Sequence, residues 1–421
     1  MPVVYVHGVA TRDAEHPFLE IEAYLRRYVA PAICADPDTM PIFHAYWGEL
    51  GARLAYGGIS RPRSLLLGQG AQTLAASDIE RALLAGSLAA ALPAAGGAAQ
   101  IVGDDLGTGL TSGRAGAGAA AELRLKDLTP DQLSDLLVEL IASAEPDPQR
   151  RIALTIAADA AARDVGLAAA LASAPDLATE CQRLVQGMAA AASVDGLVAQ
   201  GGGWLQRMAD VLKETLGRAA SAPGAVATLV AAELRRPLND FVSGFLGDAF
   251  VYLEHRQMPG SGAPGPIQQV FLDRMAKAVD AQQQRAGEAI VVLSHSMGGQ
   301  IVYDAATHFM PRDPRFTGVR IALWCATASQ VGYFEELKLF CASESQYQAA
   351  APAPFPAAHI DAWWNVWDPN DFISYSARGI FDGVDDTPYL SGMSLLGAHS
   401  GYLRRPSFYR QLRDHVEGAL S

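Results

Sequence analysis

A serine within a run of small residues is the most promising chemical group in this sequence. Ser296 belongs to the hexapeptide Ser294-His295-Ser296-Met297-Gly298-Gly299, which follows an apolar run over 290–293 and precedes a helical pattern over 300–309. A serine at a sharp strand-to-helix turn projects its hydroxyl above the sheet, and small residues two places to either side let the strand and helix approach. Ser294 stands where glycine is most usual, a departure that the sterics of the turn tolerate. We therefore expect Ser296 to be a nucleophile, with His295 packed beneath the turn.

The residue after this serine is expected to contribute through its backbone. Met297 would stand at the start of the helix, where N–H groups lack partners and the helix dipole favours negative charge. Its N–H is therefore the expected first donor to an oxyanion formed when the serine attacks a carbonyl group.

Two carboxylates and two histidines later in the chain are candidates to complete a catalytic site. Asp368 and Asp371 both follow a predicted strand over Trp363–Trp367, and the histidines downstream of them are His399 and His415. In such a site a histidine takes the serine proton and a carboxylate orients and stabilises the charged imidazole. His399 lies in a predicted loop before the last helix, whereas His415 lies within that helix and is expected to be a surface or core residue.

Four features together resemble the α/β-hydrolase superfamily, specifically its lipase-like and esterase-like members. They are an opening strand that ends in His7-Gly8, the turn at Ser296, an acid after a late strand and a histidine near the C-terminus. The resemblance covers the two ends of the chain. It implies an α/β fold with a mostly parallel sheet, helices on both of its faces, and a Ser-Asp-His order along the chain.

The resemblance also assigns roles to individual residues. Asp371, which is followed by an apolar pair, is similar to the family's acid, with Asp368 as the alternative acid, and His399 occupies the loop in which the family presents its general base. The loop after the first strand supplies the family's second oxyanion donor, which corresponds to the N–H of Val9 or, less favoured, of Ala10.

The elements that would position these residues can be read from apolar patterns. A buried strand is expected at Val3–Val6, a helix over about Pro17–Tyr28 and a second strand at Ile42–Trp47, which is a β-α-β opening of a parallel sheet. Further elements are expected after residue 240. They are helices around 245–252, 266–285, 300–309 and 406–418, and strands at 289–293, 319–325 and 363–367.

The composition divides the chain into a first core segment at 1–50, a mainly helical insertion or cap at 51–240, and a second core segment at 241–421 that carries the candidate site. Within the insertion Thr129-Pro130-Asp131-Gln132 predicts a capping box at the start of a helix. Other helices are expected at 176–192, 204–219 and 224–236, whereas 151–160 fits either a helix or a strand. Residues 82–103 carry no charge and are expected to form an apolar hairpin rather than a membrane span, and 107–120 is rich in small residues.

Charge and cysteine content exclude some classes of protein. The formal net charge of −13 argues against a nucleic-acid partner, which basic clusters would bind. The four cysteines show no metal-ligand spacing and are expected to be thiols. The first residues have the pattern of a core strand, so we expect the protein to be cytoplasmic or exported without a cleaved signal peptide.

These features favour a serine hydrolase that cleaves carboxylic esters of apolar acyl chains through an acyl-enzyme. The Ala- and Leu-rich insertion favours small-molecule or lipid esters and possible membrane-surface contact. No metal or organic cofactor is implied. An acyltransferase or amidase with the same triad remains an alternative, as does an effector that uses a hydrolase scaffold to bind a membrane or partner. Oligomeric state stays undetermined.

Overall fold

The fold is described here from a computed structural model. It describes residues 1–9, 11–12, 16–34, 36–56, 124–145, 147–194, 242–285, 287–391 and 398–421. Expectations for residues 82–103, 107–120, 204–219 and 224–236, and for the N–H of Ala10, lie outside these ranges.

Six parallel strands form one sheet in the order β2-β1-β3-β4-β5-β6. The strands are β1 (Val3–Val6), β2 (Ile42–Ala45), β3 (Ile290–His295), β4 (Ile321–Thr327), β5 (Trp363–Trp367) and β6 (Asp385–Pro388). Every residue of β1, β3 and β4 is buried, which explains why these strands read as continuous apolar runs in the sequence.

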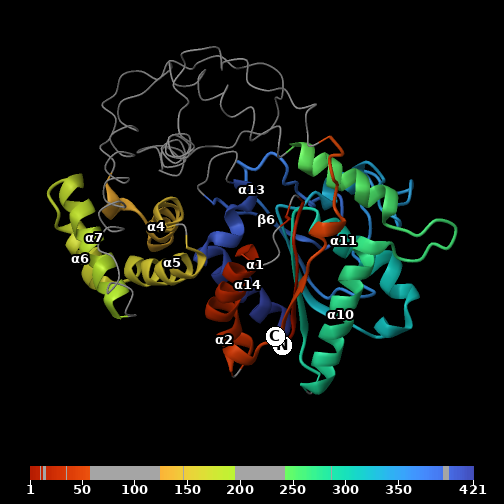
Figure 1. Cartoon of the computed structure of the whole chain (residues 1–421), viewed down its shortest axis with the longest axis horizontal. Coiled ribbons are helices and arrows are strands. Elements are labelled where there is room, and N and C mark those ends of the chain that lie inside the picture. Colours follow the sequence, from red (N-terminus) through yellow and green to blue (C-terminus); the bar gives the residue numbers. More distant parts are fainter. Residues whose placement is uncertain are drawn as a thin grey trace, which may run out of the picture.

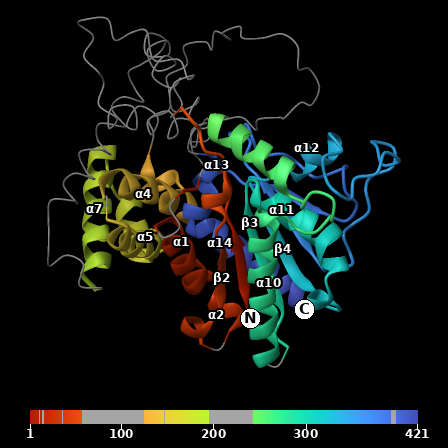
Figure 2. The same cartoon turned by 45° about the vertical axis from the view of Figure 1, so that its right-hand side comes forward.

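Helices cover both faces of the sheet, as Figure 2 shows for β3 and β4. On one face lie α1 (His16–Tyr24), a π-helical segment (Leu25–Val29), α2 (Ala30–Ile33) and α14 (Pro406–Leu420). On the other face lie a helix over 242–255, α10 (Pro266–Gln284) and α11 (Gly298–Asp304), which continues into a π-helical segment (Ala305–Phe309). The predicted α/β class is therefore confirmed.

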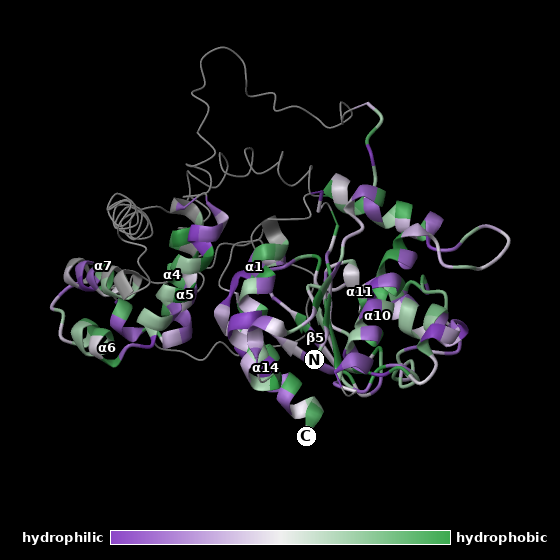
Figure 3. Cartoon of the chain, turned by 60° about the horizontal axis from the view of Figure 1, so that its bottom comes forward, coloured by the Kyte–Doolittle hydropathy of each residue, from purple (hydrophilic) through white to green (hydrophobic). Residues whose placement is uncertain are grey.

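Successive side chains of each strand point to opposite faces of the sheet, so each strand contributes to both apolar cores. In β1, Val3 and Tyr5 pack with α1 and α14, whereas Val4 and Val6 pack with α10 and α11. The covering helices are amphipathic, and α10 and α14 carry both hydrophobic and hydrophilic residues in Figure 3.

A separate group of helices has its own apolar core. It contains α4 (Pro130–Ala144), α5 (Pro148–Ala162), α6 (Val165–Ala172) and α7 (Leu177–Val194), and it lies beside α1 and α14 in Figure 1. The predicted capping box is present, because the Thr129 hydroxyl accepts from the Gln132 N–H and the Gln132 amide oxygen accepts from the Thr129 N–H. Arg410 of α14 binds Asp159 of α5 at 2.8 Å, which joins this group to the sheet layer.

Shorter helical segments complete the described chain. They are α12 (Val331–Glu336), α13 (Ala398–Gly401), and single 3₁₀ turns at Pro37–Thr39, Gly48–Leu50, Leu125–Asp127, Met310–Arg312, Pro314–Phe316 and Tyr402–Arg404. None of the helices within the described ranges is long and apolar enough to cross a bilayer.

Several boundaries differ from expectation. The helix after β1 continues to Ile33 through a π-helical segment, β3 extends to His295, and the ambiguous segment at 151–160 lies within helix α5. Strand β6 and helix α6 were not expected. All four cysteines are free thiols, as expected.

The strand order indicates where on the sheet a functional site should lie. The chain leaves β1 toward α1 on one face of the sheet and leaves the neighbouring β3 toward α11 on the other face. In open parallel sheets, ligands bind beyond the carboxyl ends of strands whose connections diverge in this way. The carboxyl ends of β1 and β3 are therefore where a functional site is expected.

Candidate functional site

Ser296 lies at this position, in the turn between β3 and α11. Its φ is +53°, a left-handed conformation that a residue with a side chain adopts only at some cost. The turn is held because the Ser296 N–H donates to the Thr327 carbonyl at 2.8 Å and the Gly299 N–H donates to the Ser296 carbonyl at 3.0 Å. The Ser296 hydroxyl is buried and makes no hydrogen bond with the described residues.

Two glycines allow the backbone to close around this serine. A Cβ at Gly8 would lie 2.6 Å from the Ser296 Cβ, and a Cβ at Gly298 would lie 2.5 Å from the Val6 carbonyl oxygen. These distances are too short for any other residue type without movement of the backbone. The loop after β1 and the start of α11 are therefore both packed directly against the turn, as the small residues of the hexapeptide predicted.

His399 and Asp371 form a buried pair. The His399 Nδ1 lies 2.9 Å from the Asp371 Oδ2, and the side chains of both residues are at most 10% exposed. The same carboxylate accepts hydrogen bonds from the Ile373 N–H at 3.2 Å and the Tyr402 hydroxyl at 3.4 Å. These donors stabilise an ionised carboxylate, which in turn favours a proton on Nδ1 and leaves Nε2 to act as a base.

Asp368 has a different set of partners. One of its oxygens accepts from the Asn370 N–H and the other from the Ser391 N–H, both at 2.8 Å. Both oxygens thus hold backbone amides of two loops, which is a structural role. Of the two acids that the sequence left open, the structure brings Asp371 to His399.

His399 lies in the short helix α13 (Ala398–Gly401) and not in a loop as predicted, and His295 joins the serine turn to this helix. Its Nε2 donates to the backbone carbonyl of His399 at 2.6 Å, and the two imidazole rings lie 4.9 Å apart. Burial, followed by the neighbouring His399, lowers the pKa of His295 to about 3, so this ring stays neutral. His295 is thus buried, as expected, and in addition holds α13 against the turn that contains Ser296.

The candidate oxyanion donors lie on either side of the serine. Met297 is fully buried and is the N-cap residue of α11, and its carbonyl accepts the first hydrogen bonds of the helix. Val9 follows Gly8, which touches the serine Cβ, and is 9% exposed. The turn before Val9 is fixed by His7, whose Nδ1 donates to the Gly8 carbonyl at 2.6 Å and whose Nε2 accepts from the Trp47 N–H at 2.9 Å.

The protonation state of His7 follows from these contacts. Burial lowers the pKa of His7 to about 3, and its ring stacks on the Trp47 indole at 4.9 Å. A neutral ring can donate from one nitrogen and accept at the other, as both hydrogen bonds require. His7 therefore supports the backbone of the loop and is not itself a candidate acid or base.

Two glutamine side chains link the serine helix to the acid loop. The Gln300 amide donates to the Gln330 side-chain oxygen at 2.8 Å, and the Gln330 amide donates to the Ile373 carbonyl at 2.5 Å. This chain of contacts fixes α11 relative to the segment that carries Asp371. Sequence reasoning missed both residues, because an amide side chain has no reactivity of its own and the two glutamines stand 30 positions apart.

A further contact explains the departure from glycine before the serine. The Trp324 indole N–H donates to the Ser294 hydroxyl at 2.8 Å, and both side chains are fully buried. Serine is therefore used here as a hydrogen-bond acceptor for the neighbouring strand β4.

The described residues contain no group of three or more histidine, cysteine, aspartate and glutamate side chains arranged to hold a metal ion. The groups at this site that could take part in chemistry are the Ser296 hydroxyl, the His399–Asp371 pair and the surrounding backbone N–H groups. Comparison with family models, curated proteins and solved structures gives no match to this chain.

Proposed function

We propose that this protein is a serine hydrolase that cleaves carboxylic esters through an acyl-enzyme on Ser296. The observation that carries the proposal is a buried serine at φ +53°, without a hydrogen-bond partner among the described residues, whose preceding residue His295 contacts the backbone of a buried His399–Asp371 pair. A strained serine at a strand-to-helix turn is typical of activated nucleophiles, and a carboxylate on Nδ1 is typical of their general base.

The proposed reaction has two steps with balanced proton transfers. The Ser296 Oγ attacks the ester carbonyl carbon while the His399 Nε2 takes its proton, and Asp371 stabilises the resulting imidazolium. The imidazolium then protonates the leaving alkoxide, so the alcohol departs and the acyl group stays on Ser296. In the second step His399 takes a proton from water as the water attacks the acyl carbon, and the imidazolium then protonates the Ser296 Oγ as the acyl–oxygen bond breaks and the carboxylic acid leaves.

The oxyanion formed in each step would be held by the N–H groups of Met297 and Val9. Two features support this assignment. Met297 is the N-cap residue of α11, and Gly8, which precedes Val9, packs against the Ser296 Cβ. Such donors act where charge develops and are already in place before the reaction.

We further propose that the fold is that of the α/β-hydrolases and that the insertion at 51–240 serves as a cap. The six-stranded parallel sheet and the position of the serine after β3 support the first part. Phe372, next to Asp371, is 70% exposed and Leu390, on the loop beside Asp368, is 72% exposed. Exposed apolar side chains on the loops around the site favour apolar acyl groups.

Covalent labelling with a fluorophosphonate probe tests the proposal. The folded protein is expected to take up one probe on Ser296, and Ser296→Ala is expected to take up none. Ser294→Ala is the matched control, because it removes a buried serine hydroxyl two residues away and should still be labelled. Absence of labelling in the folded wild-type protein would refute the enzyme hypothesis.

A series of acyl esters from acetate to palmitate, measured with and without lipid vesicles, tests the substrate class. We expect hydrolysis to favour the longer acyl chains and to increase when vesicles are present. Reaction with short soluble esters alone, without binding to vesicles, would contradict the assignment to apolar acyl chains.

A further inference from the structure

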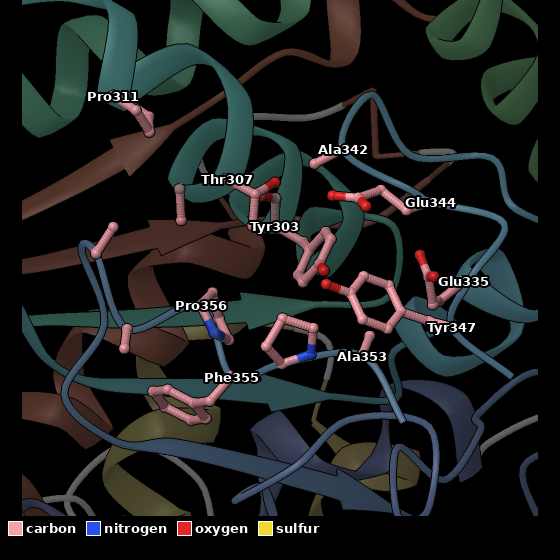
Figure 4. A pocket seen from close by; sticks show the side chains of 14 residues that line it. Tyr303, Thr307, Pro311, Glu335, Ala342, Glu344, Tyr347, Ala353, Phe355 and Pro356 are labelled. Carbon is pink, nitrogen blue, oxygen red and sulfur yellow. The ribbon is translucent and has the colours of Figure 1, made fainter. Parts of the chain in front are cut away.

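A cavity lies at the far end of the helix that follows Ser296. It has a volume of about 250 Å³ and lies between the helical run that continues from α11 and the segment over 342–358 (Figure 4). This volume corresponds to roughly eight water molecules, so it has room for a small organic ligand. The candidate hydrolase site uses none of its lining residues.

The lining is aromatic and acidic. Three rings contribute to it, those of Tyr303, Tyr347 and Phe355, together with the carboxylates of Glu335 and Glu344. None of its 14 lining residues is a lysine, arginine or histidine. Aromatic faces carry partial negative charge, so rings and carboxylates together attract cations and disfavour anions.

The two carboxylates are not equivalent. Glu335 is 2% exposed and already neutralised, because one oxygen accepts from the Lys338 ammonium at 2.6 Å and the other from the Ser343 hydroxyl at 2.5 Å. Glu344 is exposed at the rim and accepts a hydrogen bond from the neutral Gln346 amide at 2.5 Å. The negative charge that remains for a ligand is therefore that of Glu344.

Tyr303 provides the second, independent indication of a ligand. Its side chain is 95% buried, since Tyr303 is 5% exposed, and its hydroxyl forms no hydrogen bond with the described residues. Figure 4 shows this hydroxyl directed into the cavity, toward Tyr347. Burial and the nearby carboxylates raise the pKa of Tyr303, so the group stays a neutral phenol with free acceptor capacity. Because this hydroxyl lies at the wall of the cavity and has no protein partner among the described residues, it can accept a hydrogen bond from a ligand N–H.

We propose that this cavity binds a small organic monocation that carries N–H donors, namely a primary ammonium or guanidinium group. The cation would lie against the Tyr303 and Tyr347 rings, donate to the Tyr303 hydroxyl and be neutralised by Glu344. The same group occurs in free amines and guanidines and in lysine or arginine side chains of a polypeptide. This site is independent of the proposed ester hydrolysis.

Ligand-observed NMR titration of the full chain tests the proposal, with butylguanidinium and butylammonium as probes. Pentanol, a neutral analogue, and butyrate, an anion, are the matched ligand controls. We expect both cations to bind at least about tenfold more tightly than either control. A blocked arginine tripeptide separates the two sources of the group. If the tripeptide binds more tightly than butylguanidinium, the natural ligand is a polypeptide side chain. If it binds equally or more weakly, the natural ligand is a free small cation.

Three variants locate the binding site. Tyr303→Phe keeps the ring but removes the hydroxyl, and Glu344→Gln removes the charge, so each should weaken butylguanidinium binding about fivefold. Glu336→Gln, which removes a nearby exposed carboxylate that does not line the cavity, should bind as wild type. Equal binding of pentanol and butylguanidinium, or unchanged binding in both Tyr303→Phe and Glu344→Gln, would overturn the proposal. No binding to the folded protein up to about 20 mM would overturn it as well.

Discussion

Replacement of Asp371 by asparagine removes a charge from the histidine pair with almost no change in shape. The Asp371 Oδ2 lies 2.9 Å from the His399 Nδ1, and both groups are buried. At an effective dielectric constant of about 20, opposite unit charges at this separation attract by about 6 kcal/mol. This attraction exists only when His399 has taken the serine proton, so it stabilises the transition state and the intermediate rather than the resting enzyme.

The expected effect on the rate follows from this energy. Each ~1.4 kcal/mol changes a rate about tenfold, so Asp371→Asn should lower kcat for a p-nitrophenyl ester by about 10⁴. An asparagine amide can also donate to Nδ1, which would move the imidazole proton to Nε2 and block its action as a base. KM should change little, because the lost interaction does not involve the bound ester.

Asp368→Asn is the matched control for this prediction. Asp368 lies in the same loop but binds the backbone N–H groups of Asn370 and Ser391. Its replacement should cost about 1–3 kcal/mol of stability and leave kcat within about tenfold of wild type. A larger loss of kcat in Asp368→Asn than in Asp371→Asn would show that the acid is wrongly assigned. A kcat within about tenfold of wild type in folded Asp371→Asn would refute the electrostatic argument itself.

Further predictions concern the packing and protonation of the turn. Gly8→Ala should lower the Tm and slow fluorophosphonate labelling, because its Cβ would lie 2.6 Å from the Ser296 Cβ, and unchanged values of both would contradict the close packing. Ser296→Gly should be about 1 kcal/mol more stable to urea than Ser296→Ala, because a φ of +53° suits glycine, and equal stabilities would show that the turn stores no strain. His295→Phe keeps an aromatic ring but loses the hydrogen bond to the His399 carbonyl, so kcat should fall about tenfold at constant KM, whereas an unchanged kcat would show that the loop is held by other contacts. Burial lowers the pKa of His7 and His295 to about 3, below the unfolded value near 6.5, so their contribution to stability is present above pH 6.5 and is lost as pH falls toward 3. Each histidine should reduce the free energy of unfolding by about 1.4 kcal/mol per pH unit between pH 6 and 4. Urea titrations at several pH values should therefore give a plot of unfolding free energy against pH whose slope is smaller by that amount in His295→Phe than in wild type. Identical slopes would contradict the assignment.

Local patterns predicted the surroundings of Ser296 correctly. The apolar run before the hexapeptide forms β3, and the small residues after the serine begin α11. Strand, turn and helix here depend on interactions between residues a few positions apart, which a sequence displays directly. The capping box at Thr129 was predictable for the same reason.

Other features had no local pattern to reveal them. Strand β6 lies at the edge of the sheet and consists of two aspartates, a threonine and a proline. It is held by Asp386, whose carboxylate accepts from the Asn365 amide and the Ala377 N–H, both at 2.7 Å. Its partners lie in β5 and in the segment between β5 and β6. A strand fixed by such contacts lacks the apolar alternation from which strands are recognised.

The sequence by itself determined which serine stands at a strand-to-helix turn, and it restricted the histidine to two candidates and the acid to two. Only the tertiary structure decided that Asp371, and not Asp368 three residues earlier, meets His399. Two acids in one loop have nearly the same local sequence, and the partners that distinguish them, His399 for Asp371 and Ser391 for Asp368, lie 28 and 23 residues away. The partner of each therefore depends on how the loops after β5 and β6 pack against the turn after β3. The same packing brings Gln300 to Gln330 and leaves the Tyr303 hydroxyl facing a cavity, because such contacts depend on strand order rather than on neighbouring residues.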